Sequence, residues 1–288
     1  MIKISIIVPV GNAEAWGSCR KHLHASIKRY RGDVQFEIVS CMDLDHKGVS
    51  VARNEGLSRA AGDWIAWVDA DDEVSDNWAT TVAKEVKIMA ECQENGDVLL
   101  FGAHVFASNG MHREICYSKS PCIVSAGCYL HDCLVDVGGS TWLWNKVFRK
   151  KLFDGLLFYG TTQEDFRIMP RVMARAKSVR VIPDVIYTYR RPGRSLTHDG
   201  GGSLNAEGIR AAIKDNLSDV PNARFLMSSW KEGCALRAAD CIYHSGRDVE
   251  LMDFLRRNLW RIIVDHRQNF RVRVKAILAS VGVTKRRN

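Results

Sequence analysis

The first hundred residues of the chain alternate short apolar runs with longer stretches of helical character. Apolar runs bounded by turn residues predict buried strands, and the stretches between them predict helices. The predicted strands are residues 4–9, 35–41, 64–68 and 97–107, and the predicted helices are residues 13–30, 49–61 and 76–94. Strands that alternate with helices form a sheet covered on both faces. We therefore expect an α/β fold with a doubly wound, mainly parallel sheet, in which ligands bind outside the carboxyl ends of the strands.

The second half of the chain predicts a change of architecture. Residues 111–160 follow no regular pattern, whereas 164–175 predict a helix and 179–189 a strand that Pro183 interrupts. Three further helices are predicted, over residues 205–216, 221–244 and 248–280. We therefore expect a sheet-containing domain over residues 1–202 and a helical carboxyl-terminal region over residues 203–288.

Three carboxylates follow the apolar run 64–68, at Asp69, Asp71 and Asp72. Uncompensated charge is costly in a protein core, so such groups are paired, exposed or bound to a cation. Asp69 and Asp71 are two residues apart, and in an extended strand their side chains point to the same side. This arrangement suits one hard divalent cation that keeps positions for water and for a phosphate. The alternative is that Asp72 or Ser75 caps the helix that follows.

Basic residues gather at the carboxyl end of a chain whose formal net charge is +8. Within residues 254–288, Asp265 is the single acid among many arginines and lysines. Such a tail predicts an anionic partner, which could be a membrane surface, nucleic acid or an acidic glycan. Apolar residues at near-helical spacings over 254–280 would let this segment lie along an anionic membrane surface. The alternative is that the apolar stripe packs on the protein and the arginines are solvated. No nucleic-acid-binding motif occurs, so nucleic acid is not expected as a partner.

The amino terminus lacks the features of a signal peptide, and no stretch of about 18 uninterrupted apolar residues occurs. We therefore expect a cytoplasmic protein, peripheral on the inner face of the plasma membrane if its basic tail binds lipid. Nine cysteines without a signal sequence favour reduced thiols over disulfides. Cys128, His131 and Cys133 lie close in sequence, but without a C-x-x-C pair buried thiols are favoured over a zinc site.

Six fragments occur in one order along residues 3–200. They are Ser5–Asn12, Gly48–Leu57, Asp69–Asp72, Trp144–Arg149, Glu164–Asp165 and Tyr187–Arg190. In this order the fragments resemble the family 2 glycosyltransferases of the nucleotide-sugar (GT-A) fold, of the type that builds bacterial cell-surface polysaccharide. The resemblance implies an enzyme that transfers a hexosyl or N-acetylhexosaminyl group.

The resemblance implies a UDP-sugar donor and a divalent metal, Mn²⁺ or Mg²⁺. Asp71 and Asp69 would hold the metal, and His198 would complete its site. The implied donor-binding residues are Pro9, Val10, Asp43, Arg53, Asp69, Arg190 and Arg194. A cation on the donor diphosphate suits a leaving group that develops negative charge. The alternative for His198 and for the arginines is a solvated surface position.

One turn departs from the family pattern. Relatives usually carry Asp-Asp-Gly-Ser after the second strand, and a carboxylate of this turn accepts a hydrogen bond from uracil. Here the turn reads Met42-Asp43-Leu44-Asp45, only Asp43 matches, and the loop that follows is short. Gly11 also stands where many relatives carry an aromatic residue.

The acceptor side of the implied site lies later in the chain. The resemblance makes Asp165 the general base that takes the proton of an acceptor hydroxyl, in a single displacement that inverts the anomeric configuration. Glu164, Trp142 and Trp144 would contact the acceptor. The alternatives are that the two carboxylates only complement a helix dipole and that the tryptophans are core residues.

The resemblance therefore implies an inverting, metal-assisted transfer from a UDP-sugar to a hydroxyl of a glycan or of a lipid-linked acceptor. One alternative is a non-catalytic nucleotide- or glycan-binding relative, which the altered turn at Met42 suggests. The other is a sugar-phosphate nucleotidyltransferase. That enzyme requires a glycine-rich, basic loop after the first strand, and residues 9–14 do not supply one.

Overall fold

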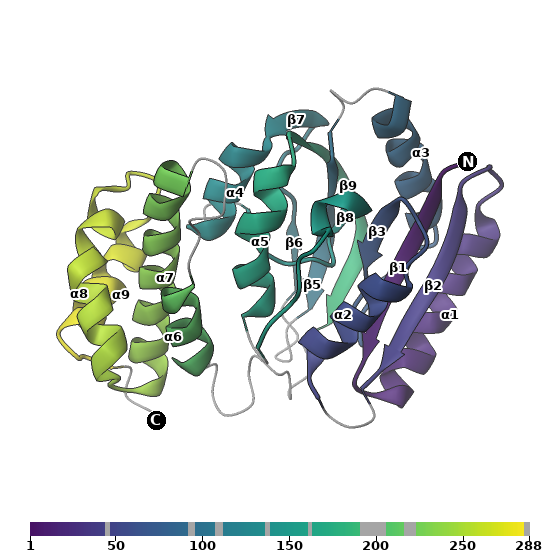
Figure 1. Ribbon diagram of the computed structural model, residues 1–288. Helices are drawn as coiled ribbons and strands as arrows, with labels where there is room; N and C mark the ends of the chain where they lie inside the picture. The colour runs from purple at the N-terminus through teal and green to yellow at the C-terminus, as the bar shows by residue number, and fades with distance from the viewer. Residues whose placement is uncertain are drawn as a thin grey trace. The chain divides into compact units, whose positions relative to one another are not determined.

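The computed structural model describes residues 1–43, 47–91, 96–106, 112–135, 139–160, 163–190, 206–215 and 223–284, with residues 223–226 described by their backbone alone (Figure 1). The chain divides into two compact units. The first unit comprises Met1–Tyr129, Trp142–Thr161 and Arg171–Pro192, and the second comprises Leu130–Thr141, Thr162–Pro170 and Gly193–Asn288. The division falls within two helices, α4 (Ala126–Leu134) and α5 (Glu164–Arg175). The predicted boundary between residues 202 and 203 lies outside the described residues and stays a prediction.

A single sheet organises the first unit, with the strand order β2-β1-β3-β8-β5-β9-β4 and with β6 paired to β5 and β7 to β9. The strands are β1 (Lys3–Val10), β2 (Gln35–Met42), β3 (Trp64–Trp67), β4 (Glu73–Val74), β5 (Val98–Phe106), β6 (His112–Ile115), β7 (Cys122–Ser125), β8 (Lys146–Arg149) and β9 (Ser178–Arg190). The helices between the first strands are α1 (Ala13–Arg29), α2 (Val49–Arg59) and α3 (Trp78–Glu91).

The long strands of this sheet run in one direction. β1 pairs in parallel with β2 and β3, and β5 pairs in parallel with β9. β8 lies between β3 and β5 and is antiparallel to both, so β3 and β5 are also codirectional. The predicted α/β fold with a mainly parallel sheet is therefore confirmed (Figure 1). The antiparallel strands β4, β6, β7 and β8 were not predicted, because two to four residues are too few to show a periodic pattern.

The alternation of side chains along β1 explains why helices cover both faces of the sheet. Ile6 points into a core that it shares with Leu23 of α1 and Val82 of α3. Its neighbour Ile7 faces α2, where a Cβ atom added to Gly56 would lie only 2.2 Å from Ile7 Cγ2. The missing side chain at Gly56 therefore lets α2 lie close against β1.

The helical part of the second unit contains α6 (Ala206–Lys214), α7 (Ala223–Ser245), α8 (Val249–Val264) and α9 (Phe270–Ser280). The single helix predicted over residues 248–280 is wrong, because α8 ends at Val264 and α9 starts at Phe270. The Asn269 side chain accepts a hydrogen bond from Val272 N and so caps a new helix. Helical spacing alone did not reveal this break.

The apolar stripe predicted over residues 254–280 lies largely inside the second unit. Leu255 and Ile262 of α8 and Ala276 of α9 are buried in one core with Ala238 and Ile242 of α7. For these residues the alternative of packing on the protein holds.

A buried polar cluster joins α7 to the segment between α8 and α9. The Arg267 guanidinium donates to both carboxylate oxygens of Asp265, at 2.9 and 3.0 Å. Burial would raise the pKa of Asp265, but these bonds hold it below its usual value. Burial, the negative charge of Asp265 and a hydrogen bond to it raise the pKa of Glu232 to about 7. Glu232 is therefore protonated in the folded protein at a pH where it ionises in the unfolded chain.

This shift predicts a pH-dependent stability. A carboxyl whose pKa is raised by folding stabilises the protein when protonated, so its contribution falls as pH rises from about 4.5 through about 7. The full effect amounts to at most about 3 kcal/mol. We expect Glu232→Gln to be more stable than the wild type at pH 8, with a smaller difference at pH 5, in urea unfolding. Glu114→Gln, at an exposed position on β6, should show no such trend, and parallel curves for wild type and Glu232→Gln would refute the assignment.

Candidate active site

The carboxyl ends of β1, β2 and β3 meet at one edge of the sheet (Figure 1). Asp43 N donates to Val10 O at 2.9 Å, and Val68 N donates to Ile7 O at 3.1 Å. The segments after the three strands therefore start side by side. Asp69 follows directly, so the predicted donor residues Pro9, Val10, Asp43 and Asp69 share this edge.

The aspartate segment is a turn rather than a continued strand. β3 ends at Trp67, and Asp72 N donates to Asp69 O at 3.1 Å across Ala70 and Asp71. The prediction that Asp69 and Asp71 share a side because the strand stays extended is therefore wrong in its geometry. Asp69 is partly exposed and Asp71 is exposed, whereas Asp72 is only 1% exposed.

Asp72 fixes this turn to strand β9. Its Oδ2 accepts from the Tyr187 hydroxyl at 2.7 Å, and its Oδ1 accepts from Arg190 N at 2.9 Å. The Tyr187 oxygen in turn accepts from Asp69 N at 3.1 Å. Both carboxylate oxygens of Asp72 are engaged in this way, so Asp72 does not cap α3. Its role is to hold the turn that presents Asp69 and Asp71.

The pKa values of the turn reflect crowded negative charge in a poorly solvated place. Burial and the charge of Asp69 raise the pKa of Asp72 well above its usual value. Desolvation by the surrounding protein also raises the pKa of Asp71, although its side chain reaches solvent. Burial and the charge of Asp72 raise the pKa of the Tyr187 hydroxyl, which keeps it a hydrogen-bond donor.

Arg53 of α2 places a positive charge beside the turn. Its Nη2 lies 3.5 Å from Asp69 Oδ1, and its side chain is only 9% exposed. The guanidinium carbon is 6.0 Å from the ring centroid of Trp67 and 5.6 Å from that of Phe158. A guanidinium that packs on aromatic rings while it faces a carboxylate is a common arrangement in partly buried sites. Arg53 thus lies at the predicted site, next to Asp69.

The same helix holds the segment that leads toward α5. Asn54 Nδ2 donates to Phe158 O at 3.0 Å, and Phe158 N donates to Asn54 Oδ1 at 2.8 Å. One turn earlier, Ser50 Oγ donates to Gly160 O at 2.5 Å. From the sequence fragment Gly48–Leu57, a role was predicted only for Arg53. The structural roles of Asn54 and Ser50, which lie in the same fragment, were not predicted.

Asp43 shapes the entrance to α2. Its carboxylate accepts from Lys47 N at 2.6 Å and from Gly48 N at 2.8 Å. Gly48 has φ 97°, in the left-handed region that favours glycine. The carboxylate predicted to contact the base is thus bound to backbone amides of its own loop. Leu44 and Asp45 lie outside the described residues.

Four aromatic rings stack beside the turn. The ring centroid of Trp144 lies 5.0 Å from that of Trp142, 4.9 Å from that of Tyr187 and 5.1 Å from that of Tyr189. The interplanar angles are 12° to 17°. Trp144 is buried in the core, whereas Trp142 and Tyr189 are half-buried. The alternative of a core tryptophan therefore describes Trp144, and Trp142 is the ring of the pair with an accessible surface.

A fully buried lysine supports this stack. Lys146 Nζ donates to Trp142 O at 2.5 Å and to Asn145 Oδ1 at 2.8 Å, and lies 5.5 Å from the centroid of the Tyr129 ring. A buried ammonium is stable only when oxygens or ring faces surround it. Lys146 therefore fixes the chain that carries both tryptophans.

Glu164 and Asp165 open α5, at the predicted start of this helix. Both are half-buried, and Asp165 Oδ1 accepts from Phe166 N at 2.6 Å. Gln163, directly before them, has φ 60°, which is uncommon for a residue other than glycine. Asp165 belongs to the second compact unit and the aspartate turn to the first.

Arg190 lies at the end of β9, and its guanidinium donates to both carboxylate oxygens of Glu73 at 2.9 Å. Arg194 and His198 lie outside the described residues, and their predicted roles stay predictions.

Three comparisons place this geometry among known proteins. The family model "Glycosyl transferase family 2" matches residues 17–91, which include α2, β3 and the aspartate turn. Two Streptococcus pneumoniae serotype 4 proteins, "Glycosyltransferase GlyA" and "Glycosyltransferase GlyG", are each 25% identical to the chain, over 225 and 183 residues. The chain is thus similar to family 2 glycosyltransferases. The first alignment covers 68% of the chain and 31% of the relative, and the second covers 60% and 58%, so the chain spans only part of either relative.

Solved structures of S. aureus TarS share the fold of this chain. TarS 1-349 in complex with UDP has a TM-score of 0.53 at 17% identity, over 93% of this chain and 74% of the other. TarS 1-349 in complex with UDP-GlcNAc has a TM-score of 0.53 at 15% identity, over 96% and 79%. At such identities the likeness shows the GT-A fold alone.

The cysteine and histidine side chains at α4 have contacts of their own. His131 Nδ1 lies 2.5 Å from Ser229 Oγ, Cys133 donates to Ser140 O, and Cys128 is exposed. Among the described residues, no group of three His, Cys, Asp or Glu side chains is arranged to hold a metal ion.

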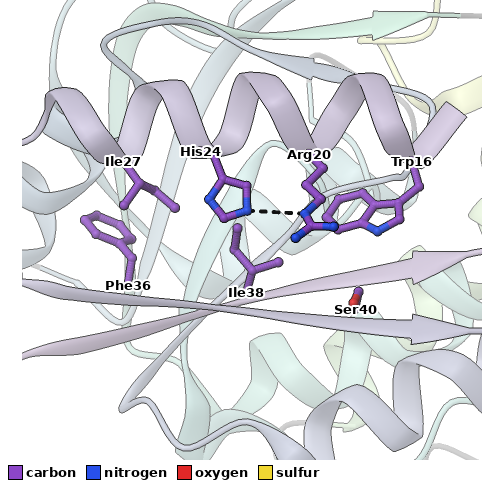
Figure 2. Close-up of a pocket in the computed structure, with 7 residues that line it drawn as sticks. All are labelled: Trp16, Arg20, His24, Ile27, Phe36, Ile38 and Ser40. Carbon is purple, nitrogen blue, oxygen red and sulfur yellow. Dashed lines mark hydrogen bonds between the residues drawn. The ribbon is translucent and has the colours of Figure 1, made fainter.

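A groove of about 410 Å³ runs along α1 and the outer strand β2 (Figure 2). It is lined by Trp16, Arg20, His24, Ile27, Phe36, Ile38 and Ser40, and none of these belongs to the aspartate turn. On the α1 side of this groove, Arg20 Nε donates to His24 Nε2 at 3.4 Å, one helical turn along. Apolar residues of β2 line this groove, so α1 does not cover that face of the strand completely.

The Tyr187 hydroxyl should be essential to the stability of the turn. Tyr187→Phe leaves Asp69 N and one oxygen of buried Asp72 without their partner, and should lower the free energy of unfolding by about 1–3 kcal/mol. Urea unfolding measures this. Tyr243→Phe, a half-buried tyrosine of α7, is the control and should change by less than about 0.5 kcal/mol. Equal effects of the two substitutions would mean that the hydroxyl bridge contributes nothing.

Proposed function

We propose that the chain transfers a sugar from a UDP-sugar to a hydroxyl of a glycan or lipid-linked acceptor in cell-surface polysaccharide synthesis. The similarity to family 2 glycosyltransferases and the GT-A fold support the reaction class. The donor assignment is supported by the structural neighbours in complex with UDP and UDP-GlcNAc. The observation that carries the proposal is the turn at the carboxyl edge of β3. Both carboxylate oxygens of Asp72 are hydrogen-bonded within the fold, while Asp69 and Asp71 stay accessible.

The accessible carboxylates fit a divalent metal. Mg²⁺ and Mn²⁺ are bound by few protein carboxylates and complete their shells with water and substrate phosphates. Asp69 and Asp71 supply such oxygens, and desolvation of Asp71 is a cost that a bound cation would offset. When bound, the metal would neutralise the charge that develops on the leaving diphosphate. Asp71 is the proposed ligand with the greater access, and Arg53 orients Asp69 through its guanidinium.

The remaining donor contacts follow from the shared sheet edge. The backbone after Pro9 and Val10 lies beside Asp43, where the nucleoside would bind. Asp43 keeps the loop before α2 closed, and base recognition would fall to the surface that it shapes. For Arg190, the pair with Glu73 must open or be shared if its guanidinium is to reach the diphosphate.

Asp165 is the proposed general base. The acceptor hydroxyl gives its proton to the Asp165 carboxylate as its oxygen forms a bond to the anomeric carbon. The bond from that carbon to the UDP oxygen breaks, and UDP leaves with the electron pair, so the anomeric configuration inverts. The unusual backbone of Gln163 supports a functional role for the residues beside it. Glu164 and the half-buried face of Trp142 are the proposed acceptor contacts, since aromatic faces present apolar area to sugars.

Loss of Asp71 should remove metal-dependent donor binding. In calorimetry with Mn²⁺, wild type should bind UDP at least about tenfold more tightly than in EDTA. Asp71→Ala should bind weakly in both conditions, whereas Asp63→Ala, an exposed carboxylate at the other end of β3, should behave as wild type. If Asp71→Ala kept the full Mn²⁺ effect, Asp71 would not be a ligand.

Loss of the Asp165 base should impair chemistry and spare binding. Asp165→Asn keeps the shape of the side chain but cannot take a proton. Turnover of a UDP-sugar that the wild type cleaves should therefore slow by about 10² or more. Calorimetric UDP affinity should change less than about twofold. Asp154→Asn, at an exposed position, is the matched control. Wild-type turnover by Asp165→Asn would remove this residue from the mechanism.

A further inference from the structure

Large apolar side chains are exposed where α8 gives way to α9. Trp260 is 55% exposed, Val264 66% and Phe270 79%, and Ile263 is also exposed. We call these four residues, with Arg257, Arg261 and Arg271, the α8–α9 corner. Exposed apolar residues that gather in one place, with a polar rim, mark interaction sites rather than ordinary surface.

The corner lies on the side of α8 that does not face the protein core. Leu251, Leu255 and Ile262 turn inward, to the core of the second unit. Trp260 and Val264 are four residues apart and point together to the opposite side. Their exposure is therefore not the margin of the buried stripe. It is a second apolar surface on the same helix.

The charges around this surface are mainly positive. Arg257, one turn before Trp260, is paired with Asp253 at 2.7 Å, whereas the guanidinium carbon of Arg261 is 4.5 Å from the Trp260 ring centroid. Asp265, the acid between the helices, is bound by Arg267 and turned into the buried cluster. Arg271 is exposed and has no acidic partner among the residues that the structure describes. An occupant of this surface must therefore combine apolar groups with negative charge.

We propose that the α8–α9 corner inserts into the headgroup region of an anionic bilayer. Tryptophan and phenylalanine favour this interface, and arginines beside them meet lipid phosphates. In the described ranges no helix is long and apolar enough to span a bilayer, so the contact is interfacial. This differs from a helix that lies apolar face down over residues 254–280, because the inner stripe is already buried.

The proposal is tested by co-sedimentation of the full chain with vesicles of phosphatidylcholine alone and of phosphatidylcholine with phosphatidylglycerol. Anionic vesicles should bind at least about tenfold more protein than neutral ones, and a rise in salt should reduce that binding. The double variant Trp260→Ser with Phe270→Ser should weaken binding at least about tenfold. Arg271→Glu should weaken it about fivefold or more, since each basic residue near the surface contributes about that factor.

Matched controls separate this surface from general stickiness and charge. Val249→Ser removes an 84% exposed apolar residue at the opposite end of α8, and Lys84→Glu reverses an exposed charge on α3. Both should bind vesicles as wild type does, and circular dichroism should show every variant folded. Equal binding to neutral and anionic vesicles, or equal loss in corner and control variants, would overturn the proposal.

Self-association is the competing outcome. If light scattering shows a dimer that Trp260→Ser with Phe270→Ser converts to a monomer, and wild type ignores vesicles, the corner binds a second copy and the membrane proposal fails. UDP affinity is measured on the same samples. Since the corner contains no residue assigned to the donor site, UDP binding should be unchanged in every corner variant, whichever way the vesicle result falls.

Discussion

The buried carboxylate of Asp72 is the constraint on which the candidate site depends. It ties the turn after β3 to the end of β9 through one hydroxyl and one backbone amide, and the same hydroxyl receives Asp69 N. These two strands are not neighbours in the sheet. Directly after the turn, β4 pairs with β9, and Glu73 forms an ion pair with Arg190, so Asp72 acts together with these contacts. The fold uses one aspartate of the cluster to position the other two.

Around this bond, charged and polar side chains on both sides of the turn hold its neighbours in place. Arg53 balances Asp69 from one side, while Asn54 and Ser50 of the same helix bind the backbone at Phe158 and Gly160. On the other side, Lys146 binds the carbonyl of Trp142 and so holds the aromatic stack that includes Tyr187. A charged residue at each flank is thus buried for positioning. Such residues orient a site precisely because their own rotamers are fixed by packing and hydrogen bonds.

The sequence predicted the long elements and the edge of the sheet where the site lies. Apolar runs bounded by turn residues suffice for β1, β2 and β5, and the place of Asp69 after a buried run follows from the same pattern. The sequence did not reveal β8, because its four residues pair with β3 and β5, which are distant in sequence. The role of Tyr187 was hidden for a similar reason: its partner Asp72 is 115 residues away, and no local pattern reports such a bond. The break at Asn269 was missed because the arginines and apolar residues of α8 and α9 continue one spacing across it.

The short connection from β2 to α2 has a consequence for how such a chain can vary. The Asp43 carboxylate binds Lys47 N and Gly48 N and so closes this loop at its base. Lengthening a loop whose ends are already joined costs little, about 0.6 kcal/mol for each doubling. Residues added between Asp43 and Lys47 would emerge beside β2, the outermost strand, whose apolar residues Phe36 and Ile38 line an open groove. An added segment there could cover that face and widen the sheet while the aspartate turn, two strands away, kept its geometry. An insertion in this loop is therefore one way in which a related chain could extend the sheet beyond β2.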